Sequence, residues 1–199
     1  LTAAVAGALG SYFKSSGIDP VHAPLRAMVP VSLRPPERGG QLGNMFGLVV
    51  MELPVQTRSA ARRLLLSKAR MSALKRSSQA RAMQALLDLF GRGPKALEAL
   101  ATQVFGSKAS LVLTNVAGPR EAVSFAGAPI DRMLFCVPHP GDALGLGVSI
   151  FSYRGQVTLT VMADAGLAPD PAAITQAFNS EFAAMLRRVK AAPQRRASR

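Results

Sequence analysis

The spacing of apolar residues changes along this chain, and that change constrains the fold more than any other feature. Leu1, Val5 and Leu9 recur at helical spacing, which predicts an opening helix. A second helical stripe, over residues 174–189, follows Asp170, which is a good N-cap with a proline behind it. The chain is therefore expected to begin and end in amphipathic helices that bury one face against something else.

Short apolar runs between these helices predict strands at residues 26–33, 46–53, 110–116, 130–137, 145–153 and 156–163. Pro30 places the first run at an edge or a bulge, whereas the nearly continuous second run suits a buried strand. Arg154-Gly155 predicts a hairpin turn between the last two. Residues 58–105 have a helical pattern that breaks at residues 91–94. With no internal repeat and no long linker, we expect one α/β (α+β) layer structure, a mixed sheet packed with helices.

The formal net charge of +13 is concentrated in two places. Residues 58–95 contain ten Lys or Arg and a single acid, Asp88, and the C-terminal residues are also basic. A solvated helix face, an anionic lipid surface and a phosphate-rich ligand such as coenzyme A each account for such charge. Nucleic acid is the weakest partner, since the chain has no zinc-finger pattern, no Trp and two Tyr.

Other residue types exclude several classes of protein and of functional site. No apolar run reaches the ~18–20 residues of a membrane-spanning helix. Cys136 is the single cysteine, so no internal disulfide forms, and its apolar run predicts a small buried residue rather than a nucleophile. His22 and His139 lie in proline-flanked turns, and the nearby Asp142 reads as turn chemistry rather than a catalytic partner. Two isolated histidines and one cysteine do not supply metal ligands at zinc spacing, so no metal site is predicted.

Two clusters place polar and small residues at the ends of predicted strands. The first joins residues 29–34 to residues 42–47, and the second covers residues 113–119 and continues to a Gly-Ala-Pro turn. Glycines at such positions permit close backbone approach. Thr114 and Asn115, at a strand end, can aim a hydroxyl or an amide at a ligand. The alternative is that Asn and Gly simply build turns there.

The order of these segments resembles the C-terminal domain of the bacterial wax ester synthase/diacylglycerol acyltransferase family. The resemblance runs over residues 1–190 and includes PVSLR at 30–34, LGNMFG at 42–47, TNVAGP at 114–119, the turn at 127–129, SYRG at 152–155 and both terminal helices. Ala117 departs from the family, which usually has proline there, and that puts the rigidity of the turn in doubt.

The resemblance implies a chloramphenicol-acetyltransferase-like lobe, one of two that enclose a tunnel. Family members transfer a fatty acyl group from acyl-CoA to a long-chain alcohol or diacylglycerol, and acyl-CoA is a substrate, so no cofactor is implied. The base is the second histidine of a His-His-x-x-x-Asp-Gly motif in the N-terminal lobe. This sequence has no adjacent histidines, so no catalytic base is expected in it, and the base would come from an upstream lobe or another polypeptide.

Site residues follow from the same resemblance. Thr114 and Asn115 would support the oxyanion of the tetrahedral intermediate. The substrate-binding residues, which include the tunnel wall, would be Gly43, Asn44, Phe46, Gly118 and Pro119.

The resemblance also implies an N-terminal lobe, acyl-CoA and a lipid acceptor as partners, and a cytoplasmic location peripheral to the inner membrane or lipid droplets. Residues 191–199 would be a flexible basic tail. The alternative is a non-catalytic module whose basic helices bind a lipid surface or another partner.

Overall fold

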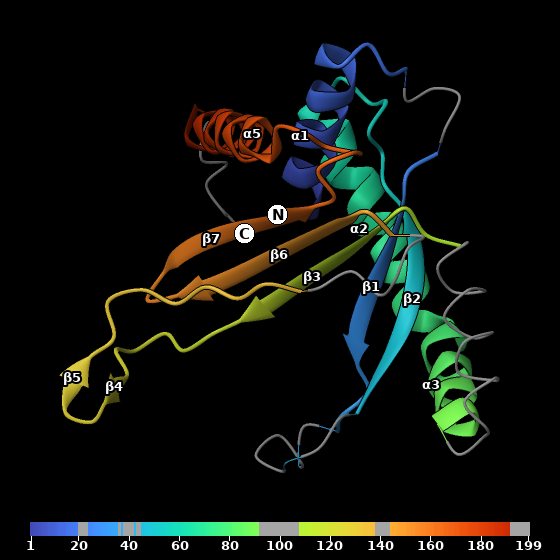
Figure 1. Ribbon diagram of the computed structural model, residues 1–199, viewed down its shortest axis with the longest axis vertical. Coiled ribbons are helices and arrows are strands. Elements are labelled where there is room, and N and C mark those ends of the chain that lie inside the picture. The colour runs from blue at the N-terminus through green and yellow to red at the C-terminus, as the bar shows by residue number, and fades with distance from the viewer. Residues whose placement is uncertain are drawn as a thin grey trace, which may run out of the picture.

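A computed structural model describes residues 1–19, 24–35, 37, 42, 45–91, 108–137 and 144–191. Five strands form one mixed sheet in the order β2-β1-β3-β6-β7 (Figure 1). The strands are β1 (Arg26–Ser32), β2 (Phe46–Glu52), β3 (Leu111–Ala117), β6 (Leu146–Tyr153) and β7 (Gln156–Ala163). Strands β1, β3 and β6 run parallel to one another, whereas β2 and β7 are antiparallel to their neighbours at the two edges.

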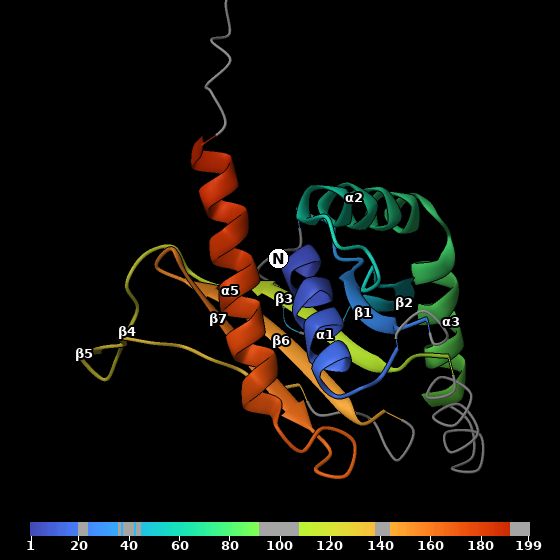
Figure 2. The ribbon, with the colours of Figure 1, turned by 90° about the horizontal axis from the view of Figure 1, so that it is seen from above.

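Helices cover one face of this sheet. They are α1 (Thr2–Ser15), α2 (Ala60–Arg76) and α5 (Pro171–Ala191), and α3 (Gln79–Gly91) lies beside β2. Seen from above, α1 lies between α5 and α2 (Figure 2). The hydrophobic core lies between α1, α5 and the sheet, and its most buried side chains include Leu9, Val49, Leu111, Ile150 and Ile174. Alternate residues of the strands, Met28 and Val112 among them, form a smaller cluster on the other face.

The pairing of β1 with β3 is short. Ala27 pairs with Leu111 and Met28 with Val112, and no further pair joins the two strands in the described residues. The β1–β2 ribbon and the β3–β6–β7 ribbon then diverge (Figure 1). Pro30 lies beyond the last pair with β3 while it pairs with Leu48 of β2. The expectation that Pro30 marks an edge strand or a bulge is therefore wrong, because β1 lies inside the sheet and its register with β2 is unbroken from Arg26 to Ser32. The proline is accommodated because, in the described residues, the pairing of β1 with β3 ends at Met28, before Pro30.

The described residues between β3 and the parallel strand β6, 118–137 and 144–145, contain no helix. The chain runs through a projecting arm that contains the short pair β4 (Ser124–Phe125) and β5 (Ala128–Pro129). It then returns along residues 130–137 to the sheet (Figure 1). There the backbone N–H of Val137 donates to Ser149 Oγ at 3.0 Å. The returning segment thus packs on β6, on the face opposite the helices.

Most sequence expectations are confirmed, including both terminal helices and five of the six strands. The Asp170 N-cap is confirmed, since Asp170 Oδ1 accepts from the N–H of Ala173 at 3.1 Å. The Arg154-Gly155 turn has positive φ at both residues, 51° and 77°. The predicted strand at 130–137 is wrong, because that segment lies across the sheet instead of within it. The second strand is an edge strand with one buried face, not a fully buried one.

Candidate active site at the strand ends

The carboxyl ends of the three parallel strands lie at one end of the sheet. Strand β1 ends at Ser32, β3 at Ala117 and β6 at Tyr153. Phe46 joins them because it begins the antiparallel strand β2 and pairs with Ser32. The carboxyl ends of parallel strands are the usual place for ligands in open sheets. The structure therefore places the described members of both sequence clusters at the same end, on two ribbons that diverge.

Thr114 and Asn115 lie on opposite faces of β3. Successive side chains of a strand alternate, and Leu111 and Leu113 belong to the core beneath the helices while Val112 belongs to the cluster on the other face. Thr114 therefore shares the face of Val112 and is buried, with 4% exposure. Asn115 follows Leu113 and is exposed. Only one of these two side chains can be directed at a given reacting carbonyl.

Gly118 and Pro119 bind the end of β3 to the end of β6. The N–H of Gly118 donates to the carbonyl of Ser152 at 2.9 Å, and the N–H of Arg154 donates to the carbonyl of Pro119 at 3.1 Å. A Cβ atom at position 118 would overlap the Phe151 ring and the Ser152 carbonyl. The glycine is required by this close approach, and the turn after Asn115 is held by the neighbouring strand even though Ala117 replaces the expected proline.

Tyr153 fixes both sides of the projecting arm. Its phenol accepts a hydrogen bond from the Val123 N–H at 3.0 Å and donates one to the Ile130 carbonyl at 2.8 Å. The tyrosine is buried, and it is the last residue of β6. The arm therefore leaves the sheet at a defined point beside the Gly118-Pro119 turn. Sequence reasoning noticed Tyr153 only within the SYRG segment and did not assign it this role.

Phe46 is exposed at 41%, as a residue that lines a shared surface would be. Gly43 and Asn44, the other two predicted wall residues, lie outside the described residues, as do His22, His139 and Asp142. Among the described residues, no three metal-ligating side chains gather, and no helix has the length and apolarity needed to span a bilayer.

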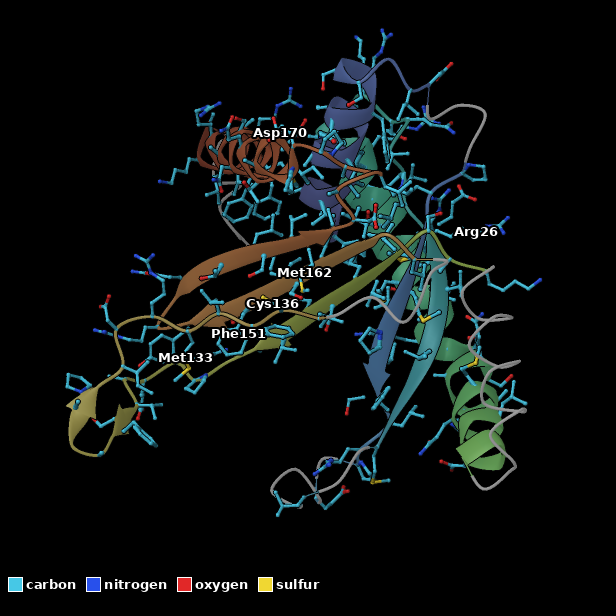
Figure 3. All side chains as sticks on the ribbon, viewed as in Figure 1. Arg26, Met133, Cys136, Phe151, Met162 and Asp170 are labelled. Atoms are coloured by element: carbon cyan, nitrogen blue, oxygen red, sulfur yellow. The ribbon has the colours of Figure 1, made fainter. Side chains whose placement is uncertain are left out.

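Cys136 is exposed, so its prediction as a buried residue is wrong. The apolar run around it is not a core strand. It lies in the returning segment, where Phe135 contacts Phe151 of β6 edge-on, with ring centroids 5.6 Å apart. Figure 3 labels Cys136 and Phe151. The neighbouring Cys136 is consequently left on the outside of that segment.

Two recesses bear charged residues. The larger, about 590 Å³, lies among α1, α2 and α5, where Arg63 and Glu181 form an ion pair with each other. The smaller, about 450 Å³, lies between the end of β1 and the junction of α2 with α3. We call the smaller one the basic recess; its lining residues are Val31, Ser32, Leu33, Lys75, Arg76, Ser77, Ala80 and Arg81.

The sequence analysis did not predict the helix junction at the basic recess, because it treated residues 58–90 as one helical stretch. Helix α2 ends at Ser77, whose backbone is extended (ψ 159°). The Ser77 hydroxyl donates to the Leu74 carbonyl at 2.7 Å and accepts from the Gln79 N–H at 3.3 Å. The pair Ser77-Ser78 could have indicated this junction, since serine favours helix ends.

Comparisons with known proteins bear on the family and the fold of this chain. The sequence matches the family described as the WS/DGAT C-terminal domain over residues 42–186. A Mycobacterium bovis protein named as a candidate diacylglycerol O-acyltransferase is 33% identical over 164 residues, which is 76% of this chain and 31% of that protein. Wax ester synthase/diacylglycerol acyltransferase 8 of Arabidopsis thaliana is 31% identical over 133 residues, 65% of this chain and 26% of that one.

The fold has the same relatives. The wax ester synthase/diacylglycerol acyltransferase of Marinobacter aquaeolei VT8 superposes with a TM-score of 0.63 at 23% identity, over 92% of this chain and 40% of that structure. A condensation domain of the enacyloxin polyketide synthase gives 0.54 at 17% identity, over 96% of this chain and 36% of that structure. This chain thus spans about a third of the length of the curated relatives that it matches.

Proposed function

Because this chain belongs to the wax ester synthase/diacylglycerol acyltransferase (WS/DGAT) family, we propose that it forms the C-terminal lobe of an acyl-CoA-dependent O-acyltransferase. The whole enzyme moves a fatty acyl group from acyl-CoA to a long-chain alcohol or a diacylglycerol. The observation that carries this proposal is the gathering of Phe46, Asn115, Gly118 and Pro119 at the carboxyl ends of the parallel strands. The partner is an N-terminal lobe that carries the His-His-x-x-x-Asp-Gly motif.

The reaction needs a base and an oxyanion donor. The alcohol oxygen attacks the thioester carbonyl, the base takes the alcohol proton, and the tetrahedral intermediate then expels the CoA thiolate. The base belongs to the N-terminal lobe in this proposal. Asn115 supplies the donor, because its amide is exposed at the end of a strand that is bonded to β6 along its length. A preorganised donor of this kind is worth about 2.7–4 kcal/mol in the transition state.

The projecting arm supports the assignment of a partner lobe. It leaves the body of the molecule (Figure 1) and carries Phe125, which is 78% exposed, while Leu134 of the returning segment is 60% exposed. Large apolar side chains at such exposure mark surfaces that meet another protein surface. The arm begins beside the Gly118-Pro119 turn, so a lobe that it contacts would close over the strand ends.

A lipid-surface function rests on a separate observation. Helix α2 exposes Leu64 and Leu65 at 47% and 67%, and the exposed residues Arg62 and Lys68 lie on the same helix. Apolar and basic side chains on one outward surface suit contact with anionic lipid. We include peripheral binding to the inner membrane or lipid droplets in the proposal, since an enzyme with lipid acceptors must reach them. The same surface would serve a non-catalytic lipid-binding module.

Release of CoA from a long-chain acyl-CoA in the presence of a fatty alcohol distinguishes the two functions. The full-length protein is expected to turn over, and this 199-residue chain alone is not, because general base catalysis contributes about 10²–10⁴-fold. Turnover by the purified chain alone would place a base within it and overturn the proposed division of labour. Vesicle binding without turnover by the full-length protein would support the non-catalytic module.

A further inference from the structure

We propose that the basic recess is the subsite for the phosphate groups at the nucleotide end of acyl-CoA. This inference rests on the proposed function for its ligand, but its geometry stands alone. Three cationic side chains, Lys75, Arg76 and Arg81, line the recess, and no carboxylate is in its lining among the residues that the structure describes. CoA carries a pyrophosphate and a ribose 3′-phosphate, which need several cations within a small volume.

The charges of the basic recess are available to a ligand. All three side chains are exposed, and none of them takes part in an ion pair among the described residues. The larger recess differs in this respect. Its Arg63 guanidinium donates to the carbonyls of Ala3, Thr57 and Arg58 and pairs with Glu181, so its bonding capacity is used within the protein. The lining of the larger recess also contains Lys14 and Arg58, but Asp19 and Glu181 offset their charge, so the basic recess attracts an anion more strongly.

The helix geometry adds to this attraction. Helix α3 begins at Gln79, and two lining residues, Ala80 and Arg81, belong to its first turn. The N-terminus of a helix carries a partial positive charge and presents backbone N–H groups, which favour phosphate. Arg81 and the start of α3 thus act from one side of the recess while Lys75 and Arg76 act from the end of α2.

The walls of the recess are held in place. A Cβ atom at Gly47 of β2 would overlap the carbonyl oxygen of Ala80, so the start of α3 lies directly against the strand. Ser77 joins the two helices by hydrogen bonds to Leu74 and Gln79. A recess of about 450 Å³ with fixed walls has the size of a small-molecule site rather than of a flat membrane contact.

The position of the recess fits an extended substrate. Its strand wall, Val31 to Leu33, is the carboxyl end of β1, the same end of the sheet that presents Asn115 on β3. In CoA a flexible pantetheine chain separates the phosphates from the thioester. If the phosphates bind at the end of the β1–β2 ribbon, the pantetheine part of CoA would cross toward the end of the β3–β6 ribbon, where the acyl carbon reacts.

Titration of the chain with CoA, dephospho-CoA and inorganic phosphate tests the subsite. Lys75→Gln is expected to weaken CoA binding about tenfold, the loss of one charge-assisted hydrogen bond. The matched control is Lys68→Gln, which removes the same charge from the same helix two turns earlier and outside the recess. Lys68→Gln should leave the affinity within about twofold, because an exposed charge at that distance is largely screened.

Ligands that differ in their phosphate groups test which phosphates the basic recess binds. Dephospho-CoA is expected to bind about tenfold more weakly than CoA, and this difference should vanish in the Lys75→Gln/Arg76→Gln/Arg81→Gln variant. Equal losses from Lys68→Gln and Lys75→Gln would overturn the site in favour of a diffuse basic surface. Inorganic phosphate that binds as tightly as CoA would overturn the nucleotide assignment, and no measurable CoA binding by the unaltered chain would overturn the subsite.

A turnover assay separates this inference from the proposed function. If the full-length protein transfers acyl groups and the Lys75→Gln variant raises KM for acyl-CoA about tenfold at unchanged kcat, both stand. Acyl transfer with an unchanged KM would overturn the subsite alone. Loss of CoA affinity in the variants, with no acyl transfer by the unaltered protein, would leave the subsite standing and overturn the proposed function.

Discussion

Arg63 of α2 and Glu181 of α5 form an ion pair that joins two helices on opposite sides of α1 (Figure 2). Arg63 also donates to three backbone carbonyls, one from α1 and two from the segment before α2. One arginine thus connects all three helices that cover the sheet.

Arg63→Ala is expected to lower the free energy of unfolding by about 3 kcal/mol, because it leaves a carboxylate and three carbonyls without their donor. Arg62→Ala is the control, since Arg62 is exposed on the same helix and such changes stay within about 0.5 kcal/mol. Denaturant titration of both variants measures the difference. A loss below 1 kcal/mol in Arg63→Ala, about the level of an exposed pair, would mean that the pair is not structural.

The opposite orientations of Thr114 and Asn115 give a second prediction, made in the full-length enzyme. Asn115→Ala is expected to lower kcat by about 10²–10³-fold, because an oxyanion donor acts on the transition state. Thr114→Val should leave kcat nearly unchanged, since the buried hydroxyl lies on the other face. kcat and Tm are measured on one preparation. A destabilised Asn115→Ala enzyme with normal kcat would remove Asn115 from the mechanism and make Thr114 the candidate.

Tyr153→Phe tests the attachment of the arm. The change removes both hydrogen bonds of the phenol, each worth about 0.5–1.5 kcal/mol, and leaves the ring in place. Amide exchange at Val123 should become faster, while the core strands keep their protection. Hydrogen exchange read by mass spectrometry gives both values. Tyr12→Phe is the control, because Tyr12 of α1 is buried in the core. Faster exchange in the arm of that variant as well would contradict a specific role for Tyr153.

The exposed surface of α2 predicts salt-sensitive lipid binding. The chain should sediment with vesicles that contain anionic lipid, and binding should fall steeply near 1 M salt, where the Debye length is about 3 Å. Leu64→Ser/Leu65→Ser should reduce the binding that remains at high salt, since these leucines supply the apolar contact. Equal binding to neutral vesicles at high salt would show that the charges on α2 are not used.

The parts of the fold that the sequence predicted are those that local pattern determines. The closing helix follows from the Asp170 cap and its apolar stripe, and the β6–β7 hairpin from Arg154-Gly155. The failures at Pro30 and Cys136 have a common physical cause, which is long-range arrangement. Whether Pro30 needs a hydrogen-bonded neighbour depends on where β3 stops pairing with β1, and the burial of Cys136 depends on how its segment crosses β6.

The candidate site also has a part that local pattern determines and a part that long-range arrangement determines. The position of Asn115 and Gly118 at a strand end could be predicted because strand ends rich in Asn and Gly are visible in one dimension, whereas their roles in a site were implied only by the family resemblance. The basic recess was not predicted, since it joins the end of β1 to a helix junction more than 40 residues later in the chain. The sequence showed the positive charge of residues 58–95 but not which cations share a concave surface.

The short junction between β1 and β3 has a consequence for folding. In the described residues, β1 and β3 share the pairs Ala27–Leu111 and Met28–Val112, and the N–H of Ser110 donates to the carbonyl of Arg26, so the main-chain bonds across that seam are few. Helix α1 packs against both α2 and α5 and connects the ribbons from above. Cooperative unfolding units tend to follow such divisions. The β1–β2–α2–α3 part and the β3–β6–β7–α5 part would then open as separate units once α1 is displaced, with the seam as the first part of the sheet to lose protection.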